Sequence, residues 1–488
     1  MKTLEEIKKT RLEKLKSLNQ AGFSGYPSKT KRTHPVGKAV EDFEELVDSK
    51  KKIILAGRIR SLRTHGKLTF LDIEDGSGKI QGLLRENNLG EKGYQFFLDH
   101  FDIGDFAELQ GTLFETKTKE KTLDVTNFRV LAKSLRPLPE KWHGLQDVEE
   151  RYRKRYLDLL MNPEVKEVFQ KKSQLAKLLR EYLDQKGFVE VKTPTLQPIY
   201  GGATAQPFVT HHNALDINLY LRVSDELYLK RLIAGGFEKV YEMATDFRNE
   251  GIDRWHNPEF TMLEFYWAYA DYKDLMKMTE EMLSGIVEKL TGSRRIKYGK
   301  DEIDFIPPWP RVPYLEAFHQ ATGINLPDVT FESLKKLAEK KKLGVDLRGI
   351  FDLPTLVDHI YKTLIRTKIV NPTFLIDHPY SMRPLAKKKE DESLVESFHL
   401  ICGGVELVNA YSELNDPQDQ RSRWQEEMQR GKSGASEYQV LDEDYIEALE
   451  YGMPPTAGWG MGIDRFCALL TDQHSIKDTI LFPTMRPR

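Results

Sequence analysis

A carboxylate in the middle of an apolar strand constrains this chain more than any other feature of its sequence. Over residues 260–267 the side chains alternate between two faces. Glu264 shares its face with Phe260, Met262 and Tyr266, and both faces are largely apolar, which indicates a strand covered on both sides. An enclosed carboxylate needs a cationic or hydrogen-bonding partner, or it takes up a proton. The sequence therefore predicts a buried polar site on a sheet, and a structural salt bridge is the simpler alternative.

The residues before this strand form a recognisable set. A first strand ends in Phe-Arg-Asn-Glu at 247–250, and a polar loop with Arg254, His256 and Asn257 leads into the carboxylate strand. This set resembles motif 2 of the class II aminoacyl-tRNA synthetases, and it is most similar to that of the lysyl-tRNA synthetases. The resemblance implies an α+β fold, in which an N-terminal OB-fold β-barrel precedes a class II catalytic domain with an antiparallel sheet flanked by helices.

The size and charge of the chain fit several domains with a neutral body. At 488 residues the chain is long enough for two or more domains. Its hydrophobic and charged fractions, 40% and 30%, are typical of a soluble globular protein. The net charge of -2 excludes a molecule that is basic as a whole.

The first 52 residues are more basic than the rest of the chain. They hold 13 Lys and Arg against 8 Asp and Glu, and residues 4–18 have the spacing of an amphipathic helix. We expect residues 1–52 to form a basic helical extension that packs on another surface. Its lysines either add phosphate affinity or form a solvated helix face.

The cysteines and the lack of apolar runs indicate the compartment. Cys402 and Cys467 lie in apolar surroundings, which indicates buried, inert thiols rather than a disulfide framework or a zinc knuckle. The sequence has no run of about 18 apolar residues, and its first residues lack the apolar core of a secretory signal. We expect a cytoplasmic protein with no membrane segment.

Residues 53–135 have the pattern of a small barrel of the OB type. Short alternating segments between turn residues are typical of such a barrel, and a helical stretch near 91–100 interrupts them. The strands are predicted over 53–59, 68–74, 79–84, 106–113 and 123–130.

One strand of this barrel carries an aromatic side chain that should face outward. If Leu71 and Ile73 fill the barrel, Phe70 points to the outside, where its ring can stack on a base. Burial of Phe70 under the N-terminal helix is the alternative. The family resemblance implies that the barrel binds the tRNA anticodon, with Arg63, Phe70 and Gln81 around the middle base.

A proline-rich link over residues 136–146 leads to a second domain, residues 147–488. Asn162 and Pro163 are placed as the cap and first turn of a helix that ends near Gly187. A strand follows, and the proline that ends it requires a position at a sheet edge or strand terminus. This order is common. It also resembles motif 1 of the class II synthetases, which builds a two-fold dimer interface, so the resemblance implies a homodimer.

Glycines alternate along residues 458–462, just before Arg465 opens a helix. Glycines on a strand give up side-chain packing, which indicates that another group approaches the backbone closely. A guanidinium at a helix start favours a phosphate or a stacked base, and a tight strand–helix joint is the simpler alternative. The segment resembles motif 3 of the class II synthetases, where the arginine contacts ATP. The phosphate-binding patterns GxxxxGK[ST] and GxGxxG are absent from the sequence.

The strand that ends near Glu413 should line the same site. Asn409, Tyr411 and Glu413 share one face, whereas Glu406 has the opposite parity and needs a bulge or bend to face the same pocket. The family resemblance makes this strand part of the amino-acid site. It implies lysine binding by Gly202, Glu226, Glu264, Tyr266, Asn409, Tyr411 and Glu413.

The acidic character of these positions suits a substrate with two amines, each of which can donate charge-assisted hydrogen bonds. The resemblance places the α-amine at Glu226 and the Gly202 carbonyl group. It places the ε-amine at Glu413 and Tyr266, with Glu264 nearby. An aspartate-specific relative needs positive groups in this pocket, and none stands at the matched positions.

The resemblance also implies ATP as a substrate and Arg248 and Arg465 as catalytic residues. The lysine carboxylate would attack the α-phosphorus, and the terminal ribose hydroxyl of tRNA(Lys) would then attack the lysyl-adenylate. Positioning and charge neutralisation should supply most of the acceleration. The implied ATP-binding residues are Arg248, Glu250, His256, Asn257, Phe260, Glu406, Leu407, Gly462, Asp464 and Arg465.

Magnesium is the implied cofactor, and one of its expected ligands is changed. Glu406 matches a metal ligand of the family, but His399 stands where the family usually has a glutamate. Mg²⁺ prefers oxygen ligands. Three explanations stay open: a shifted local alignment, an altered metal site, or water in place of the missing ligand.

Together these features predict a homodimeric, ATP-dependent lysine–tRNA ligase with L-lysine, ATP and tRNA(Lys) as partners. The alternatives are a relative that charges aspartate or asparagine, an enzyme that lysylates a protein, and a regulatory synthetase-like protein with an impaired site. The acidic pocket argues against the first and the barrel against the second, whereas His399 supports the third.

Overall fold

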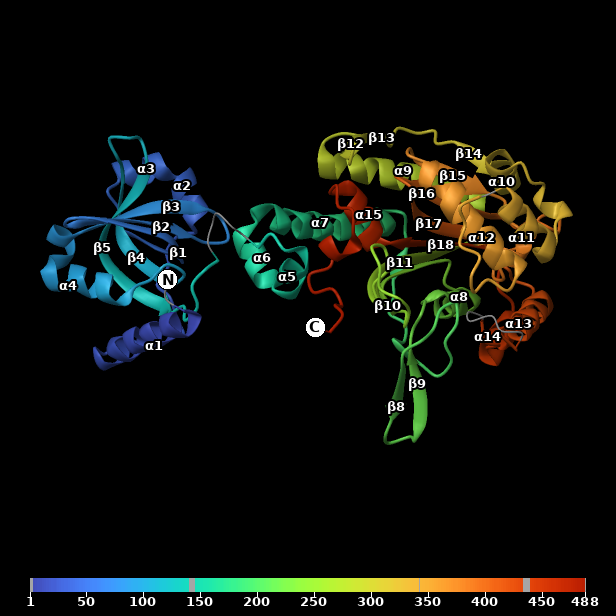
Figure 1. The fold of residues 1–488 in the computed structure, drawn as a ribbon, viewed down its shortest axis with the longest axis horizontal. Helices are drawn as coiled ribbons and strands as arrows, with labels where there is room; N and C mark the ends of the chain where they lie inside the picture. The colour runs from blue at the N-terminus through green and yellow to red at the C-terminus, as the bar shows by residue number, and fades with distance from the viewer. Residues whose placement is uncertain (1–2, 140–144, 342, 433–438, 488) are drawn as a thin grey trace. The chain divides into compact units, whose positions relative to one another are not determined.

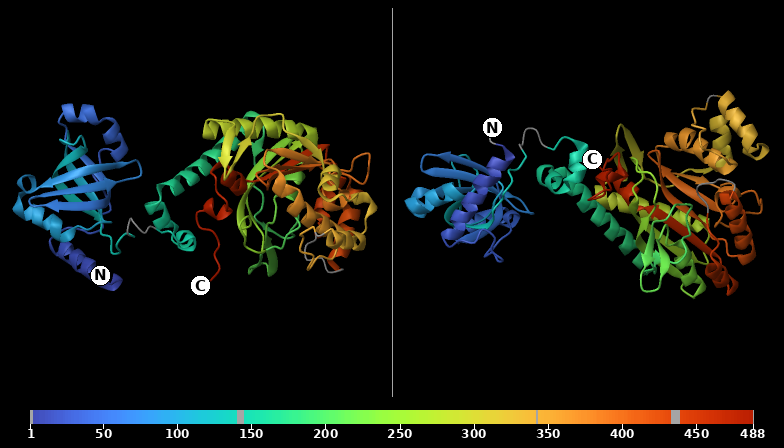
Figure 2. Two further views of the ribbon diagram at one scale, coloured as in Figure 1. Left: turned by 45° about the horizontal axis from the view of Figure 1, so that its top comes forward. Right: turned by 60° about the horizontal axis from the view of Figure 1, so that its bottom comes forward.

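Two compact units, Met1–Gly144 and Leu145–Arg488, make up the chain in the computed structural model, which describes residues 3–139, 145–341, 343–432 and 439–487. Figures 1 and 2 show a barrel in the first unit and a large sheet with helices in the second. The predicted fold class is therefore confirmed. Part of the predicted link, residues 136–146, lies outside the described residues. Among the helices that the structure describes, none is long and apolar enough to cross a membrane.

The first unit is a closed five-stranded barrel of order β1-β2-β3-β5-β4. Its strands and the helix that crosses between them are β1 (Ile53–His65), β2 (Leu68–Glu74), β3 (Lys79–Arg85), α4 (Glu86–His100), β4 (Phe106–Glu115) and β5 (Lys121–Ala132). The predicted strands and helix are confirmed: β2 keeps its predicted bounds, and the structure extends the other elements. The helices before the barrel are α1 (Leu4–Gln20), α2 (Val36–Glu41) and α3 (Phe43–Asp48). Leu18, Val36 and Phe43 from these helices belong to the barrel's own apolar core.

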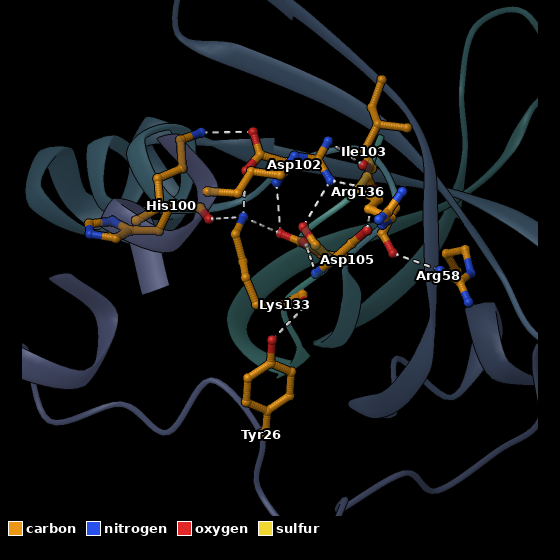
Figure 3. Close-up of polar contacts among 12 residues, drawn as sticks. Tyr26, Arg58, His100, Asp102, Ile103, Asp105, Lys133 and Arg136 are labelled. Atoms are coloured by element: carbon orange, nitrogen blue, oxygen red, sulfur yellow. Dashed lines mark hydrogen bonds and ion pairs between the residues drawn. The ribbon is translucent and has the colours of Figure 1, made fainter. Parts of the chain in front are cut away.

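Polar contacts fix α1 to the barrel. Arg11 of α1 is buried, and its guanidinium donates to the carbonyl oxygens of Ser134 and Ile103 at 2.9 and 3.0 Å. Figure 3 shows the neighbouring network, in which Lys133 Nζ donates to Asp105 Oδ2 at 2.7 Å. The expectation that the basic helix packs on another surface is confirmed. Its attachment depends on a buried guanidinium as well as on Leu18.

An eight-stranded sheet forms the centre of the second unit, in the order β14-β15-β16-β17-β18-β11-β10-β6. Neighbours pair antiparallel except near the two edges, where β14 pairs parallel with β15 and β6 with β10. β6 lies at an edge, as the proline after it requires. The strands are β6 (Val189–Glu190), β10 (Lys239–Phe247), β11 (Glu259–Ala268), β14 (Arg311–Pro313), β15 (Thr373–Ile376), β16 (Ser397–Cys402), β17 (Val405–Ser412) and β18 (Thr456–Gly462).

Different helices cover the two faces of this sheet (Figure 1). On one face α7 (Pro163–Gln185), α9 (Tyr272–Thr291) and α15 (Ile463–Leu470) enclose an apolar core that includes Leu263 of β11. On the other face α8 (Glu226–Ala234), α13 (Pro417–Lys432) and α14 (Glu443–Glu450) surround a smaller core with Tyr266. Glu264 has the parity of Tyr266 and is 7% exposed, so its predicted enclosure is confirmed.

The remaining elements are peripheral to the sheet. They are α5 (Val148–Arg153), α6 (Arg155–Met161), β7 (Leu196–Gln197), β8 (Val209–His212), β9 (Ile217–Leu221), β12 (Arg295–Tyr298), β13 (Asp301–Asp304), α10 (Tyr314–Thr322), α11 (Phe331–Lys340) and α12 (Leu353–Leu364). Asn162 precedes α7 as predicted, but its side chain does not cap the helix. Its amide donates instead to Asp158 Oδ1 at 2.7 Å. Both cysteines are free and buried, as predicted.

Candidate active site

Strand β18 brings several expected site residues together because it has glycines where its neighbours have side chains. Gly458 of β18 lies opposite Tyr266 of β11 on one side and Tyr411 of β17 on the other. A Cβ atom at Gly458 would lie 1.9 Å from Glu413 Oε1 and 2.6 Å from Tyr266 Cε1. The predicted close approach to the glycine backbone is confirmed. The approaching groups are acidic and aromatic side chains of the site itself.

Glu264 lies within this group and is hydrogen-bonded by hydroxyl groups. Ser224 Oγ donates to its Oε1 at 3.2 Å, and the Tyr266 hydroxyl donates to its Oε2 at 3.1 Å. Burial, and after it the carboxylates of Asp246 and Glu226, raise the pKa of Glu264 to about 8. The free protein therefore keeps a proton on Glu264 at neutral pH.

A buried lysine, which sequence patterns alone did not reveal, joins two of the expected lysine-binding carboxylates. Lys230 Nζ lies 2.6 Å from Glu226 Oε1 and also contacts Glu413 Oε2. Burial opposes the charge of Lys230, but these two carboxylates outweigh it and raise its pKa. The Tyr411 hydroxyl donates to Glu226 Oε1 at 2.7 Å. The i,i+4 spacing of Glu226 and Lys230 on a helix permits this pair, but it predicts neither the burial of the lysine nor its contact with Glu413.

Two further carboxylates, also absent from the sequence prediction, lie beside Glu264. Oxygen atoms of Asp225, Asp246 and Glu264 lie within 4.8 Å of one another, and all three residues are buried. Burial raises the pKa of Asp246 to about 6. Burial, and then the charges of Glu264 and Asp246, raise the pKa of Asp225 well above its ordinary value. Three carboxylates this close share protons unless a cation joins them.

Gly202, in the loop that precedes β8, lies close to Ser224 and Glu226. Its φ of +84° lies in the left-handed region, which favours glycine. A Cβ atom there would lie 3.0 Å from Ser224 Oγ and 3.1 Å from Glu226 Cβ. The backbone of Gly202 is therefore next to Glu226, the residue with which it is expected to share the α-amine.

Arg248 follows β10 and lies against an aromatic ring. Its guanidinium carbon is 5.0 Å from the centre of the Phe260 ring, and its Nε donates weakly to Val223 O at 3.4 Å. Stacking on a ring limits the rotamers of a long side chain, and Nη2 also makes a long contact with Val223 O at 3.5 Å. An anion can replace contacts as long as these. Arg248 is thus held in place before any substrate binds.

Arg465 lies in the first turn of α15 and contacts the motif 2 loop. Its Nη2 is 3.3 Å from His256 Nε2, and His256 Nδ1 is 2.8 Å from Asp253 Oδ2. Burial lowers the pKa of Arg465; Glu406 opposes the shift, and the charges of Arg248 and Arg366 add to it. This concentration of positive charge favours an anionic ligand.

Gly462 and Asp464, two of the residues expected at ATP, connect β18 to α15. Gly462 precedes the helix, and Asp464 is buried inside its first turn. Asp464 Oδ2 accepts from Thr261 N at 2.9 Å, and its Oδ1 contacts Lys172 Nζ. Both carboxylate oxygens therefore have protein partners, and we infer that Asp464 positions the helix that carries Arg465.

Three other expected ATP residues differ in how much of their side chain is free. Asn257 Nδ2 donates to Glu259 O at 2.6 Å, which shapes the loop. Leu407 belongs to the main apolar core, so its backbone is the part that can reach a ligand. Glu250 is exposed, and its Oε1 accepts from Gln206 N at 3.4 Å.

The bulge that the parity of Glu406 requires is present. Opposite Leu400 and Ile401 of β16, strand β17 has one extra residue, Leu407. The bulge turns the Glu406 side chain toward β16. There its Oε2 lies 3.2 Å from His399 Nδ1.

The residues around His399 do not fit a magnesium ion. His399 is 4% exposed, and Arg383 Nη2 contacts its ring. Burial, followed by the charges of Arg383, Lys362 and Arg366, holds the pKa of His399 well below its ordinary value. A neutral imidazole with a guanidinium against it offers Mg²⁺ neither oxygen ligands nor negative charge. Of the two expected metal positions, Glu406 alone has the chemistry of a ligand.

On the barrel, the three residues expected at the anticodon lie near one another. Arg63 of β1 is directly opposite Phe70 of β2. Gln81 of β3 is opposite Asp72, which lies two residues along β2 from Phe70. Residues two apart on a strand share a face, so the three side chains belong to one side of the barrel wall.

The alternation of strand β2 agrees with the outward position of Phe70. Leu71 and Ile73 are fully buried, whereas Phe70 is half-buried. Within the described residues, Phe70 is not among the side chains packed with Leu18 of α1 in the barrel core. Phe70 thus lies outside the core that Leu18 of α1 joins, and its role at the anticodon stays a prediction.

Comparison with known proteins identifies relatives for both units. The family model for tRNA synthetases class II (D, K and N) matches residues 147–486, and that for the OB-fold nucleic acid binding domain matches residues 53–131. A lysine–tRNA ligase from Carboxydothermus hydrogenoformans is 51% identical over 486 residues, which is 99% of each chain. Lysine–tRNA ligases from Pelotomaculum thermopropionicum and Roseiflexus castenholzii are each 48% identical over 99% of this chain and cover 96% and 99% of their own length.

Proposed function

Because this chain belongs to the class II tRNA synthetases of the D, K and N group, we propose that it joins L-lysine to tRNA(Lys) with ATP as the energy source. Residues 147–488 would catalyse the reaction, and residues 53–135 would bind the anticodon. Residues 136–146 would link the two, and residues 1–52 would form the basic extension.

The observation that carries this proposal is the excess of buried carboxylates in the amino-acid site. Asp225, Glu226, Glu264 and Glu413 are all buried, and Lys230 pairs with two of them. The ammonium groups of a substrate can displace protons from Glu264 and its neighbours, so this pocket suits a substrate with two ammonium groups. Lys230 is a cation in this pocket, but it already pairs with Glu226 and Glu413, so the side-chain carboxylate of aspartate would compete with them for it.

Arg248 and Arg465 are the groups that would bind the negative charge of ATP. In the first step an oxygen of the lysine carboxylate bonds to the α-phosphorus, the bond to the bridging oxygen breaks, and pyrophosphate leaves. A carboxylate is already nucleophilic, so this step needs no general base. In the second step the terminal ribose hydroxyl of tRNA attacks the adenylate carbonyl, loses its proton, and AMP leaves.

Magnesium belongs to this proposal as the ion that ATP carries from solution. Glu406 remains its candidate protein ligand. His399 and Arg383 do not fit the ion.

Lysine-dependent exchange of labelled pyrophosphate into ATP tests the proposed function. We expect exchange with L-lysine and none above background with L-aspartate or L-asparagine. Exchange with aspartate would assign the pocket to a different amino acid. Silence with all three amino acids would favour a regulatory protein with an impaired site, the alternative that His399 supports.

Glu413→Gln is expected to raise the KM for lysine by about 10- to 100-fold and to change the KM for ATP little. The substitution removes the negative charge that the ε-ammonium would meet and leaves the ATP residues intact. Exchange kinetics at varied lysine and at varied ATP measure the two constants. Glu281→Gln, an exposed carboxylate on α9, is the control. An unchanged KM for lysine would remove Glu413 from the amine site.

Lysine binding is expected to release a proton near neutral pH. Because the pKa of Glu264 is raised to about 8, the free site holds a proton that an arriving ammonium displaces. The affinity for lysine should therefore rise with pH up to about 8, by at most about tenfold per unit. The raised pKa also means that protonated Glu264 contributes to the free energy of unfolding. This contribution is fully present below the pKa that the Glu264 carboxyl group has in the unfolded chain, and it is lost as the pH rises through about 8.

Titration calorimetry in buffers of different ionisation heat measures the proton release directly. Glu264→Gln should abolish most of it, because the amide does not titrate. Proton release that is equal in wild type and variant would place the titrating group elsewhere.

Phe70→Ala is expected to raise the KM for tRNA in aminoacylation by about 5- to 100-fold and to leave lysine-dependent exchange unchanged. The loss follows from removing a stacking platform on the barrel, which takes no part in adenylate formation. Phe114→Ala is a matched control, since Phe114 is a half-buried phenylalanine on β4. A loss of both activities would mean that Phe70 supports the fold of the barrel rather than tRNA binding.

The homodimer is supported by apolar side chains near the sheet edge. Val189 of β6 and Leu196 of β7 are each 47% exposed, in the segment that resembles motif 1. A two-fold interface would cover them. Sedimentation equilibrium is expected to give twice the mass of one chain, and Val189→Glu should shift the equilibrium toward monomer.

Because tRNA and ATP are its substrates, the proposal also places the protein in the cytoplasm.

A further inference from the structure

Beside Glu406, where the family resemblance implies a metal ion, the chain supplies a cation of its own. Arg383 Nη2 contacts His399 Nε2 and lies 3.3 Å from its Nδ1. His399 Nδ1 in turn lies 3.2 Å from Glu406 Oε2. A guanidinium only donates, so we assign Nε2 of the imidazole as an acceptor and Nδ1 as the donor to the carboxylate. Arg383, His399 and Glu406 thus form a hydrogen-bonded chain from a cation to an anion.

The backbone of Arg383 is well anchored. Its N–H donates to Tyr380 O at 3.0 Å, and its carbonyl oxygen accepts from Ala386 N at 3.3 Å and Arg423 Nη1 at 3.4 Å. Within the described structure, Arg383 Nε is buried and lacks a hydrogen-bond partner. A buried donor without an acceptor, next to a site that would take a polyanion, points to an acceptor supplied by the ligand.

The charges at this place balance without a metal. Two carboxylates and a divalent cation sum to zero charge, and so do the Glu406 carboxylate and the Arg383 guanidinium, which the ring of His399 joins. Arg366 adds further positive charge near His399, and a divalent ion held here would be repelled by both guanidinium groups. The replacement of a metal-ligating carboxylate by His399 therefore agrees with the presence of Arg383.

We propose that Arg383 takes the place of a protein-bound divalent cation at this site and binds the triphosphate of ATP and the pyrophosphate that leaves it. The inference rests on the proposed function, since it assigns the cation of the same site. Guanidinium groups bind phosphate oxygens through paired N–H donors. The chain therefore binds fewer divalent ions per nucleotide than a site with carboxylates at both 399 and 406.

Counting bound Mn²⁺ by electron paramagnetic resonance tests the proposal without turnover. The full-length protein is titrated with Mn²⁺ in the presence of L-lysine and α,β-methylene-ATP, which cannot form the adenylate. The double variant His399→Glu, Arg383→Ser restores a carboxylate pair and is expected to bind at least one more Mn²⁺ per chain than the wild type. Equal counts in folded wild type and double variant would overturn the proposal.

Arg383→Ser alone provides a second measurement. It is expected to weaken the binding of inorganic pyrophosphate, measured by calorimetry, by about 10- to 100-fold. Arg348→Ser is the control, because the Arg348 side chain is 91% exposed. Unchanged pyrophosphate affinity in Arg383→Ser would overturn the proposal even if the double variant does not fold. If the wild-type protein shows no lysine-dependent ATP–pyrophosphate exchange, that result would instead contradict the proposed function.

Discussion

Arg248→Ala is expected to slow lysine-dependent ATP–pyrophosphate exchange by about 100- to 1,000-fold. The guanidinium is held against the ring of Phe260, 5.0 Å from its centre, before substrate binds. It can therefore neutralise charge that develops at the α-phosphorus without reorganising during the reaction. Exchange rates at saturating lysine and ATP measure the effect on kcat, and rates at low concentrations measure kcat/KM.

Two variants separate the position of Arg248 from its charge. Arg248→Lys keeps the charge but loses the planar fork, so only part of the activity should return. Arg295→Ala, at an exposed arginine on β12, should leave exchange unchanged. An Arg248→Ala enzyme with nearly wild-type exchange would exclude Arg248 from the reaction.

Lys230→Met is expected to lower the free energy of unfolding by about 3 to 5 kcal/mol at neutral pH. Lys230 pairs with Glu226 and Glu413 in the interior, and all three side chains are nearly or fully buried. Methionine fills a similar volume but leaves two carboxylates close together without a cation. Burial raises the pKa of Glu413 well above its ordinary value, so the loss of stability should shrink as the pH falls and Glu413 takes up a proton.

Urea unfolding followed by tryptophan fluorescence measures this effect, since Trp424 and Trp459 are buried in the same unit. Lys277→Met is the control, because the Lys277 side chain is 76% exposed. Adding Glu226→Gln to Lys230→Met should recover part of the stability by removing one uncompensated charge. A Lys230→Met variant as stable as the wild type at pH 7 would mean that the cluster is already neutral through protonation.

Local sequence patterns predict the strands of the barrel but not the attachment of helix α1. Its five strands follow from alternating side chains and turn residues, and the outward position of Phe70 follows from the burial of Leu71 and Ile73. The attachment of α1 does not follow from such patterns. From the sequence, Arg11 is expected to be an exposed basic residue of the helix. In the structure it is buried against the carbonyl oxygens of Ser134 and Ile103. Its partners lie more than ninety residues away in the sequence, beyond the reach of any periodicity.

In the active site, too, some residues follow from sequence patterns and others are brought together only by folding. Strand parity places Glu264 and Tyr266 on one face, and it requires the bulge that the structure has at Leu407. No sequence pattern predicts that Asp225 and Asp246 belong to the site, because each lies near the end of a different element. Strand pairing and helix packing bring both residues to Glu264. Arg383 comes from an irregular segment, and its contact with His399 is set by how that segment folds over β16.

Side-chain alternation, the strand positions that need glycine and the family that the motifs resemble can all be read from the sequence, because these properties depend on neighbours along the chain. Which charged groups come into contact depends on the folding of distant segments. Burial removes the screening of water, so a carboxylate's pKa and a cation's partner depend on groups brought together from distant segments. Lys230 between two glutamates and Arg383 against His399 are therefore features that only the folded chain defines.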